Sequence, residues 1–146
     1  MAKRVREIMT ESPACCTQDT TLDAVAKMMV EHDCGEIPVV DADDRVIGVI
    51  TDRDIVCRIV AEGKNPVEFT AAACMSQPAI TVDQNAEIED AVSIMESHLI
   101  RRIPVVTEQG RCAGILSQAD LARTGPPRKV GELVREVSQG VLRASH

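Results

Sequence analysis

Apolar and polar residues follow the same succession of periods twice along the chain. In the first stretch, apolar side chains at positions 22, 25, 26 and 29 have helical spacing and follow a capping Thr20 or Thr21. Two β-branched runs flank an acidic turn at residues 41–44, which predicts a hairpin. We expect a strand, a helix, two strands and a helix, at residues 14–17, 22–32, 36–41, 46–51 and 52–61.

The second stretch predicts the same order of elements, at residues 79–82, 86–98, 102–107, 112–117 and from 118 onward. The tetrapeptide Ile-Pro-Val-Val occurs at residues 37–40 and again at 103–106, an offset of 66. Other positions keep this offset: Leu22 with Ile88, Met29 with Met95, Gly48 with Gly114, Thr51 with Ser117, and Asp54 with Asp120. Self-similarity at a fixed offset indicates a tandem duplication.

Two copies of about 60 residues are too few for an open solenoid, so we expect each copy to bury the apolar face of the other. The predicted fold class is α+β, with two tandem β-α-β-β-α units packed about a pseudo-twofold axis. The predicted bounds are 3–62 and 71–124 for the units, 63–70 for a linker, and 125–146 for a C-terminal amphipathic helical tail. The tail covers the module or a dimer interface, or binds a different protein.

The formal net charge of -7 and the pI near 4.9 argue against a nucleic-acid or anionic-membrane surface, which needs a basic patch. No apolar run reaches the length of a membrane span, so we expect a cytoplasmic protein. The six cysteines form no C-x-x-C pair and do not recur between the copies, which favours small buried hydrophobes over a metal site. Vicinal Cys15 and Cys16 form the only pair that the sequence proposes for oxidation.

Candidate chemistry lies where the third strand of each copy meets its second helix. The pattern Gly, two apolar residues, Thr or Ser, two further residues and Asp places Thr51 before Asp54 and Ser117 before Asp120. Such a pair is a capping box in any fold. The same geometry also presents backbone N–H groups to a phosphate, and an aspartate, shorter than the usual capping glutamate, could instead accept two hydrogen bonds from a ribose.

Two arginines distinguish the second copy from the first. Arg101 and Arg102 precede the second Ile-Pro-Val-Val, where the first copy has Gly35 and Glu36. Strand alternation directs neighbouring side chains to opposite faces, so at least one arginine could reach a groove between the copies and bind phosphate. Solvated arginines beside a strand are the alternative. If the groove reading is right, the two copies bind a ligand unequally.

The doubled order of elements, the strand with its Pro-Val-Val and the segment Gly-Val-Ile-Thr-Asp-Arg-Asp resemble the cystathionine-beta-synthase (CBS) domain, which occurs as tandem pairs, or Bateman modules. The resemblance covers residues 3–124. It implies a regulatory, signal-transduction module whose clefts bind AMP, ADP, ATP, NAD or S-adenosylmethionine, with no catalytic cofactor or metal. It also implies a homodimer, with an unidentified protein as a further partner.

The resemblance also implies roles for single residues. Asp54 and Asp120 match the ribose-binding aspartate, and Thr51 and Ser117 match the hydroxyl that meets ribose or phosphate, while Arg101 and Arg102 match phosphate-binding positions. The remaining residues implied as ligand-binding are Arg53, the edge-strand pairs Cys16–Thr17 and Ile80–Thr81, which read the adenine by their backbone, and Ile37, Pro38, Ile103 and Pro104, which line an apolar slot. Gly35, Glu36, Gln118 and Ala119 depart from the pattern of the opposite copy, which puts equal occupancy in doubt.

Three functional hypotheses remain open from the sequence. The first is a nucleotide-sensing regulatory module, in which the ligand favours one conformation. The second is a protein-interaction scaffold with vestigial nucleotide sites, in which Thr51 and Ser117 only cap helices. The third, an enzyme or thiol redox protein, lacks a recognisable pair of nucleophile and base, so we expect no enzyme.

Overall fold

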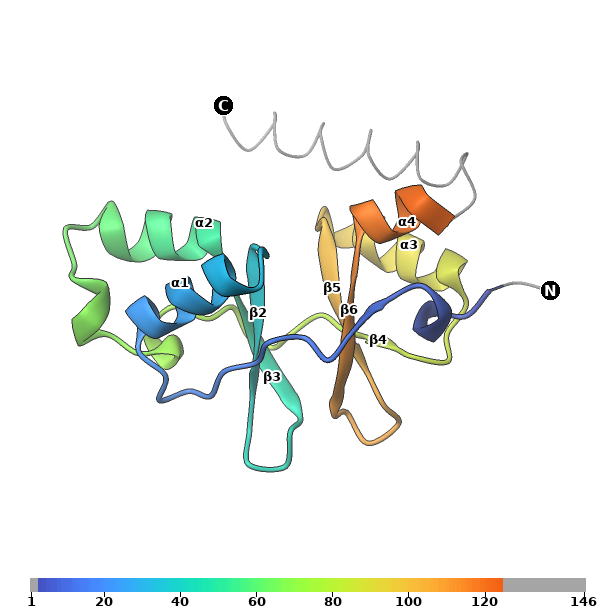
Figure 1. The fold of residues 1–146 in the computed structure, drawn as a ribbon, viewed down its shortest axis with the longest axis horizontal. Coiled ribbons are helices and arrows are strands. Elements are labelled where there is room, and N and C mark those ends of the chain that lie inside the picture. Colours follow the sequence, from blue (N-terminus) through green and yellow to red (C-terminus); the bar gives the residue numbers. More distant parts are fainter. Residues whose placement is uncertain (1–2, 125–146) are drawn as a thin grey trace. The chain divides into compact units, whose positions relative to one another are not determined.

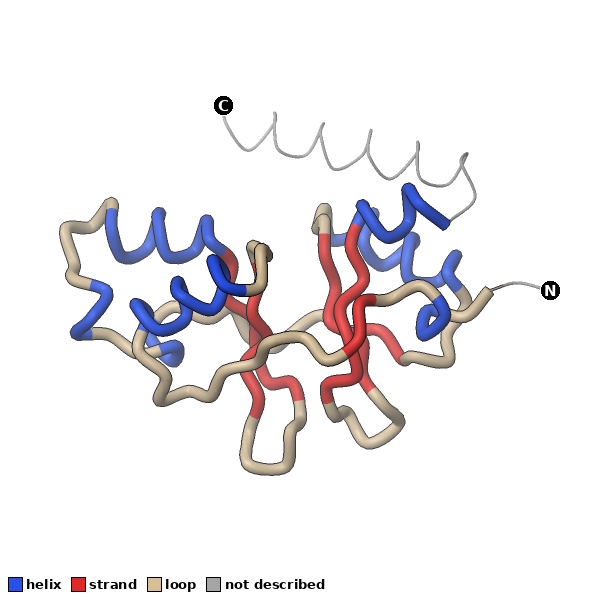
Figure 2. The backbone as a smooth tube through the Cα atoms, viewed as in Figure 1, coloured by secondary structure: helices blue, strands red, loops and turns tan. Residues whose placement is uncertain are grey.

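A computed structural model describes residues 3–124 of the 146-residue chain, and the expected C-terminal tail lies outside the described residues. The chain divides into two compact units, drawn in Figures 1 and 2. The first-repeat unit comprises Pro13–Ile80 and Gln109–Cys112. Among the described residues, the second-repeat unit comprises 3–12, 81–108 and 113–124. Each unit mixes helices and strands, which confirms the predicted α+β class.

The first-repeat unit is built on one hairpin. Strands β2 (Glu36–Val40) and β3 (Val46–Thr51) pair antiparallel, as the two β-branched runs around an acidic turn predicted. The turn is fixed by Asp41, whose carboxylate accepts from the backbone N–H of Asp43 at 2.9 Å and of Arg45 at 3.0 Å. Helix α1 (Leu22–Glu31) and the short α2 (Asp52–Ile55) complete the repeat (Figure 1).

The core of the first-repeat unit joins the buried face of α1 to the hairpin. Leu22 and Val25 on α1 are fully buried, and so are Ile37 on β2 and Ile50 on β3. The apolar residues of the helix and of both strands therefore form one core. Burying side chains of this size supplies most of the stability of such a unit.

The second-repeat unit contains one four-stranded sheet in the order β1-β6-β5-β4. Its strands are β1 (Thr10–Glu11), β4 (Val82–Asp83), β5 (Arg102–Val106) and β6 (Cys112–Ser117). Helix α3 (Ile88–His98) and helix α4 (Gln118–Thr124) accompany the sheet (Figure 2). Met95 on α3, Ile103 on β5, and Leu116 on β6 are all fully buried.

The single helical turns that open the two copies are exchanged between the units. The turn Val5–Glu7 belongs to the second-repeat unit, where the N–H of Val5 donates to the carbonyl of Ala86 at 2.9 Å. The turn Ala71–Ala73 belongs to the first-repeat unit, where the N–H of Ala71 donates to the carbonyl of Thr20 at 2.8 Å. The two bonds obey the offset of 66, so the duplication extends to these turns, but each turn packs on the repeat that it does not open.

Three expected elements differ from the structure. The strand expected at residues 14–17 is a single parallel bridge between Cys16 and Val39, and the strand expected at 79–82 is the two-residue β4. The helix expected at 52–61 changes after Ile55 into a π-helix, Val56–Val60. None of the helices among residues 3–124 is long and apolar enough to cross a membrane.

Candidate functional site

The predicted capping box is present at both strand-to-helix junctions. At the end of β3, the N–H of Asp54 donates to Thr51 Oγ1 at 3.1 Å, and the N–H of Thr51 donates to Asp54 Oδ2 at 2.9 Å. At the end of β6, the N–H of Asp120 donates to Ser117 Oγ at 3.2 Å, and the N–H of Ser117 donates to Asp120 Oδ2 at 3.0 Å. Each aspartate thus reaches back to the N-cap backbone although it is shorter than the usual capping glutamate, which confirms the capping-box interpretation.

Capping uses one carboxylate oxygen of each aspartate, and the surroundings of the other differ between the units. Asp54 Oδ1 lies 3.9 Å from Nε of Arg58, beyond hydrogen-bond distance, and the Asp54 side chain is 16% exposed. Asp120 Oδ1 accepts from Thr10 Oγ1 at 3.4 Å and from Nη2 of Arg123, and its side chain is only 3% exposed. An incoming hydroxyl thus meets an available oxygen at Asp54, whereas at Asp120 it must displace or share existing donors.

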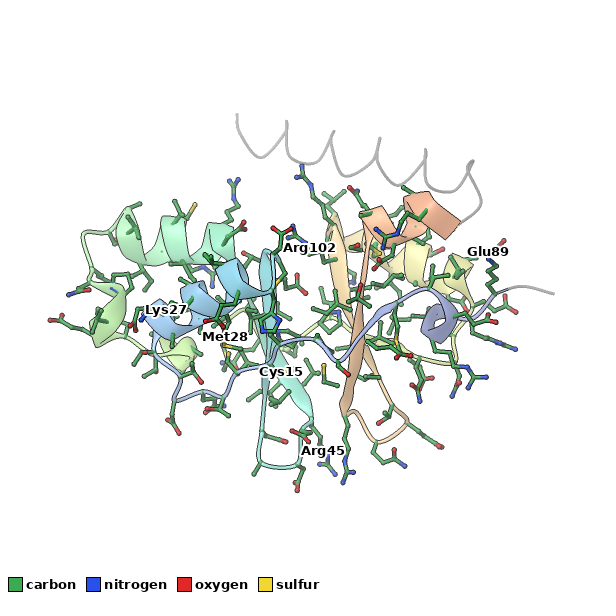
Figure 3. All side chains as sticks on the ribbon, in the orientation of Figure 1. Cys15, Lys27, Met28, Arg45, Glu89 and Arg102 are labelled. Carbon is green, nitrogen blue, oxygen red and sulfur yellow. The ribbon has the colours of Figure 1, made fainter. Side chains whose placement is uncertain are left out.

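The start of the preceding hairpin lies beside each capping box. The N–H of Asp52 donates to the carbonyl of Gly35 at 3.0 Å, and the N–H of Gln118 donates to the carbonyl of Arg101 at 3.1 Å. These equivalent bonds bring the arginine pair and the Ser117 box together in the second-repeat unit, and Figure 3 labels Arg102 at this end of β5.

The local charges of the two units are consequently unequal. Arg101 is exposed and Arg102 half-buried at the second-repeat junction, while the equivalent positions of the first-repeat unit hold the buried Gly35 and Glu36. Arg53, exposed at the start of α2, adds a positive charge near Thr51. Arginine binds phosphate through two parallel donors, so the second-repeat junction is the better equipped of the two for a phosphate group.

The two residue pairs expected to read an adenine do not occupy equivalent positions. Cys16 pairs with Val39 as Val82 pairs with Val105, so the counterpart of Cys16 is Val82 rather than Ile80. The N–H of Cys16 donates to the carbonyl of Pro38 at 3.0 Å, and the carbonyl of Cys16 accepts from Val40 at 2.8 Å. Both backbone groups of Cys16 are therefore engaged within the unit, and the register correction makes residues 14–15 the counterparts of Ile80–Thr81. Thr17 is also engaged, since its N–H donates to Thr20 Oγ1 at 3.1 Å.

The isoleucines expected to line an apolar slot lie in the cores instead. Ile37 and Ile103 are both 0% exposed, and Ile37 belongs to the core cluster of its unit. The neighbouring Pro38 and Pro104 are buried as well, so both faces of β2 and β5 are covered at these positions. The sequence could not separate the two faces, because every residue of Ile-Pro-Val-Val is apolar.

The cap hydrogen bonds give a direct prediction for stability. We expect Thr51→Ala to lower the free energy of unfolding by about 1 kcal/mol, because it leaves the N–H of Asp54 without its side-chain acceptor. Thr51→Ser keeps the hydroxyl and is the matched control. Urea denaturation of the two variants checks this, and equal stabilities would show that the hydroxyl does not cap α2.

The cysteines are distributed over buried and exposed positions. Cys16 and Cys74 are buried, Cys57 is exposed, and Cys15, Cys34 and Cys112 are half-buried. Burial, with a contribution from neighbouring Cys15, raises the pKa of Cys16 to about 11, so its thiol stays protonated at neutral pH. Within residues 3–124, no group of three or more His, Cys, Asp or Glu side chains is placed to hold a metal ion.

Known proteins match this chain over both repeats. The family model described as "CBS domain" matches residues 5–61 and 71–125. The chain is 38% identical to hypoxic response protein 1 of Mycobacterium tuberculosis over 140 residues, covering 96% of this chain and 97% of that protein.

Solved structures agree with this similarity. The crystal structure of Hypoxic Response Protein I, described as having two coordinated zinc ions, matches with a TM-score of 0.77 and 40% identity, covering 85% of this chain and 100% of the other. The CBS domain pair of protein MJ0100, solved in complex with 5'-methylthioadenosine and S-adenosyl-L-methionine, matches with a TM-score of 0.75 and 25% identity, covering 83% and 98%.

Proposed function

Because the chain belongs to the CBS domain family and contains two such domains in tandem, we propose that it is a regulatory module that binds an adenosine-containing ligand. The candidate ligands are AMP, ADP, ATP, NAD and S-adenosylmethionine. Each junction supplies a carboxylate held in place by its own capping box, Asp54 in one unit and Asp120 in the other. A fixed carboxylate can accept hydrogen bonds from a ribose diol without losing side-chain entropy.

The observation that carries the proposal is the second-repeat junction. There a carboxylate, a hydroxyl at Ser117 and the arginines Arg101 and Arg102 gather around the start of one helix. This set matches the polar groups of a nucleotide, with ribose at the carboxylate and phosphate at the arginines. Backbone at Ile80–Thr81 and the ring of Pro104 would receive the adenine, for which apolar contact supplies most of the affinity.

The first-repeat junction has the same parts with a different charge. Thr51 supplies a hydroxyl, Asp54 a carboxylate and Arg53 a positive charge. The buried Glu36 lies at the position of an arginine in the other unit, and its carboxylate would repel a phosphate. With the corrected register, the backbone of residues 14–15 takes the role first expected of Cys16 and Thr17. We therefore propose that the first-repeat site prefers a ligand with less negative charge, such as a nucleoside without a terminal phosphate.

The ultraviolet spectrum tests the proposal simply, because the chain has no Trp or Tyr and a single Phe. An adenine that copurifies with the protein will produce a band near 260 nm that passes through a filter after denaturation. Mass spectrometry of the filtrate will name the ligand. A filtrate that contains only non-adenosine compounds bound in proportion to the protein would contradict the proposal.

A protein-interaction scaffold with vestigial sites is the second candidate. It is favoured by the capping boxes, in which the hydroxyl and the acid satisfy each other, and by the donors that Thr10 and Arg123 give to Asp120. Ligands that bind only the folded state raise its unfolding midpoint. We expect at least one of AMP, ATP, NAD and S-adenosylmethionine to do so, and no shift with any of them would favour the scaffold.

We propose that the chain forms a homodimer. Val56 and Val60 stand one turn apart on the segment after α2 and are 56% and 55% exposed, an apolar pair that a second copy could cover in a homodimer. We also propose that the protein is cytoplasmic and that it regulates a further protein. Light scattering of the purified chain measures its oligomeric state.

A further inference from the structure

Two thiols that lie far apart in sequence meet in the first-repeat unit. Cys15 Sγ lies 3.5 Å from Cys112 Sγ, although 97 positions separate the two residues. Both are half-buried, so a small reagent can reach them. The distance exceeds the roughly 2.05 Å of a disulfide bond, so a hydrogen bond and not a disulfide joins the two sulfurs.

Backbone hydrogen bonds to one hairpin hold both cysteines in place. Next to Cys15, Cys16 is bonded to β2 through its N–H and its carbonyl. The N–H of Cys112 donates to the carbonyl of Asp44 at 3.0 Å, and the N–H of Val46 donates to the carbonyl of Gly110 at 3.1 Å. The close approach of the sulfurs is thus set by the β2–β3 hairpin, beside which Figure 3 labels Cys15.

The repeat does not explain this pair of side chains. At the offset of 66, the counterpart of Cys15 is Thr81 and that of Cys112 is Val46, so the duplication does not place a cysteine at either equivalent position. Cysteine at both positions is therefore a property of this chain rather than of its repeated unit.

We propose that Cys15 and Cys112 form a reversible disulfide under oxidising conditions. In thiol–disulfide exchange with a small disulfide, one cysteine thiolate attacks the reagent and releases one thiol, and the other cysteine then attacks the mixed disulfide and releases the second thiol. The two cysteines lose two protons and two electrons, which convert the small disulfide into two thiols. A reducing thiol pool reverses the reaction, so the bond records the redox state of the surroundings.

The contact also affects the reduced state. The hydrogen bond to Cys112 is the main cause that raises the pKa of Cys15, and burial adds to it. Cys15 therefore remains a thiol at neutral pH and is a slow nucleophile by itself. Its oxidation depends on the sulfur beside it, which distinguishes it from the exposed Cys57, open to reagents directly from solvent.

Peptide mapping of the full chain tests the proposal. The reduced protein is incubated with glutathione disulfide, its remaining thiols are alkylated under denaturing conditions, and it is digested with trypsin without reduction. We expect a linked pair of peptides, one with Cys15 and Cys16 and the other beginning at Cys112. The oxidised chain should also unfold on the order of 5–10 °C higher than the reduced chain, because the bond closes a long loop.

Three variants identify the atoms that react. Cys15→Ser and Cys112→Ser should abolish the linked pair, whereas Cys16→Ser, the matched control, should retain it. A bond between the vicinal Cys15 and Cys16, seen as an oxidised single peptide in the Cys112→Ser variant and in the unaltered chain, would overturn the proposal. If Cys15 and Cys112 resist alkylation, and EDTA but not a reductant restores their reaction, the cysteines bind a metal and the proposal is wrong. Neither result decides whether the backbone of residues 14–15 contacts a nucleotide, which titration of the reduced chain measures separately.

Discussion

Replacing Asp120 by alanine will weaken the tighter adenosine site more than replacing Asp54 weakens the other. Both aspartates are held by their own capping boxes, but only the second-repeat junction adds Arg101 and Arg102. A hydrogen bond to a charged group is worth about 1.5–3 kcal/mol, so we expect a loss of affinity of roughly 100-fold for Asp120→Ala and roughly 10-fold for Asp54→Ala, each at its own site. Calorimetric titration with the ligand that copurifies measures both sites.

The fold must be monitored in the same variants, because each aspartate also caps a helix. Asp120 is 3% exposed and accepts from Thr10 and Arg123, so Asp120→Ala removes more internal bonds than Asp54→Ala does. Ser117→Ala loses the cap hydroxyl and keeps the carboxylate, so it measures how far a weakened cap and a missing hydroxyl lower the affinity when Asp120 is retained. Equal losses of affinity in the two aspartate variants would refute the asymmetry between the sites.

Replacing Gly114 by alanine will destabilise the second-repeat unit by about 1–3 kcal/mol, the usual cost of an added methyl group in a packed site. A Cβ at Gly114 would lie 2.6 Å from the carbonyl oxygen of Thr10 and 2.7 Å from Sδ of Met9. The methionine can turn aside, but the oxygen belongs to β1, whose residue Glu11 pairs with Gly114. The strand must therefore move, and it carries Thr10 away from Asp120.

The equivalent Gly48 provides the matched comparison. Its Cβ would lie 2.9 Å from the carbonyl oxygen of Ser76 and 3.0 Å from Sδ of Met75, so Gly48→Ala should cost less than Gly114→Ala. Urea denaturation of both variants measures the difference. At a position that tolerates a side chain, Gly→Ala stabilises by roughly 0.4–1 kcal/mol through the unfolded chain. A gain of stability at Gly114 would contradict the close approach of β1 to β6.

The duplicated elements could be predicted because their signals are local. Leu22 and Val25 mark the buried face of α1 by helical spacing, and the acidic turn around Asp41 marks the hairpin between β2 and β3. The pairing of Thr51 with Asp54 was equally visible, since a hydroxyl and an acid three residues apart define a capping box. The same signals gave the order of the elements, and the comparisons confirm the family that this doubled order resembles.

What the sequence missed depends on contacts between distant segments. Strand β1 has only two exposed residues, Thr10 and Glu11, so no period reveals it before it pairs with β6. The sequence did not show that Cys16 and Ile80 occupy different positions of the repeat, because the hydrogen bonds of the two edge segments to β2 and β5 fix that equivalence. The contact of Cys15 with Cys112 has no sequence signal, because it arises only when residues 97 positions apart meet.

Calorimetric titration of the unaltered chain and of the Asp54→Ala/Asp120→Ala double variant with AMP, ATP, NAD and S-adenosylmethionine tests the central claim most directly. The account predicts saturable binding of at least one of these ligands by the unaltered chain. It also predicts loss of that binding in a double variant that still unfolds cooperatively. Binding of the same strength in the double variant, or no binding of any of the four by the unaltered chain, would contradict it.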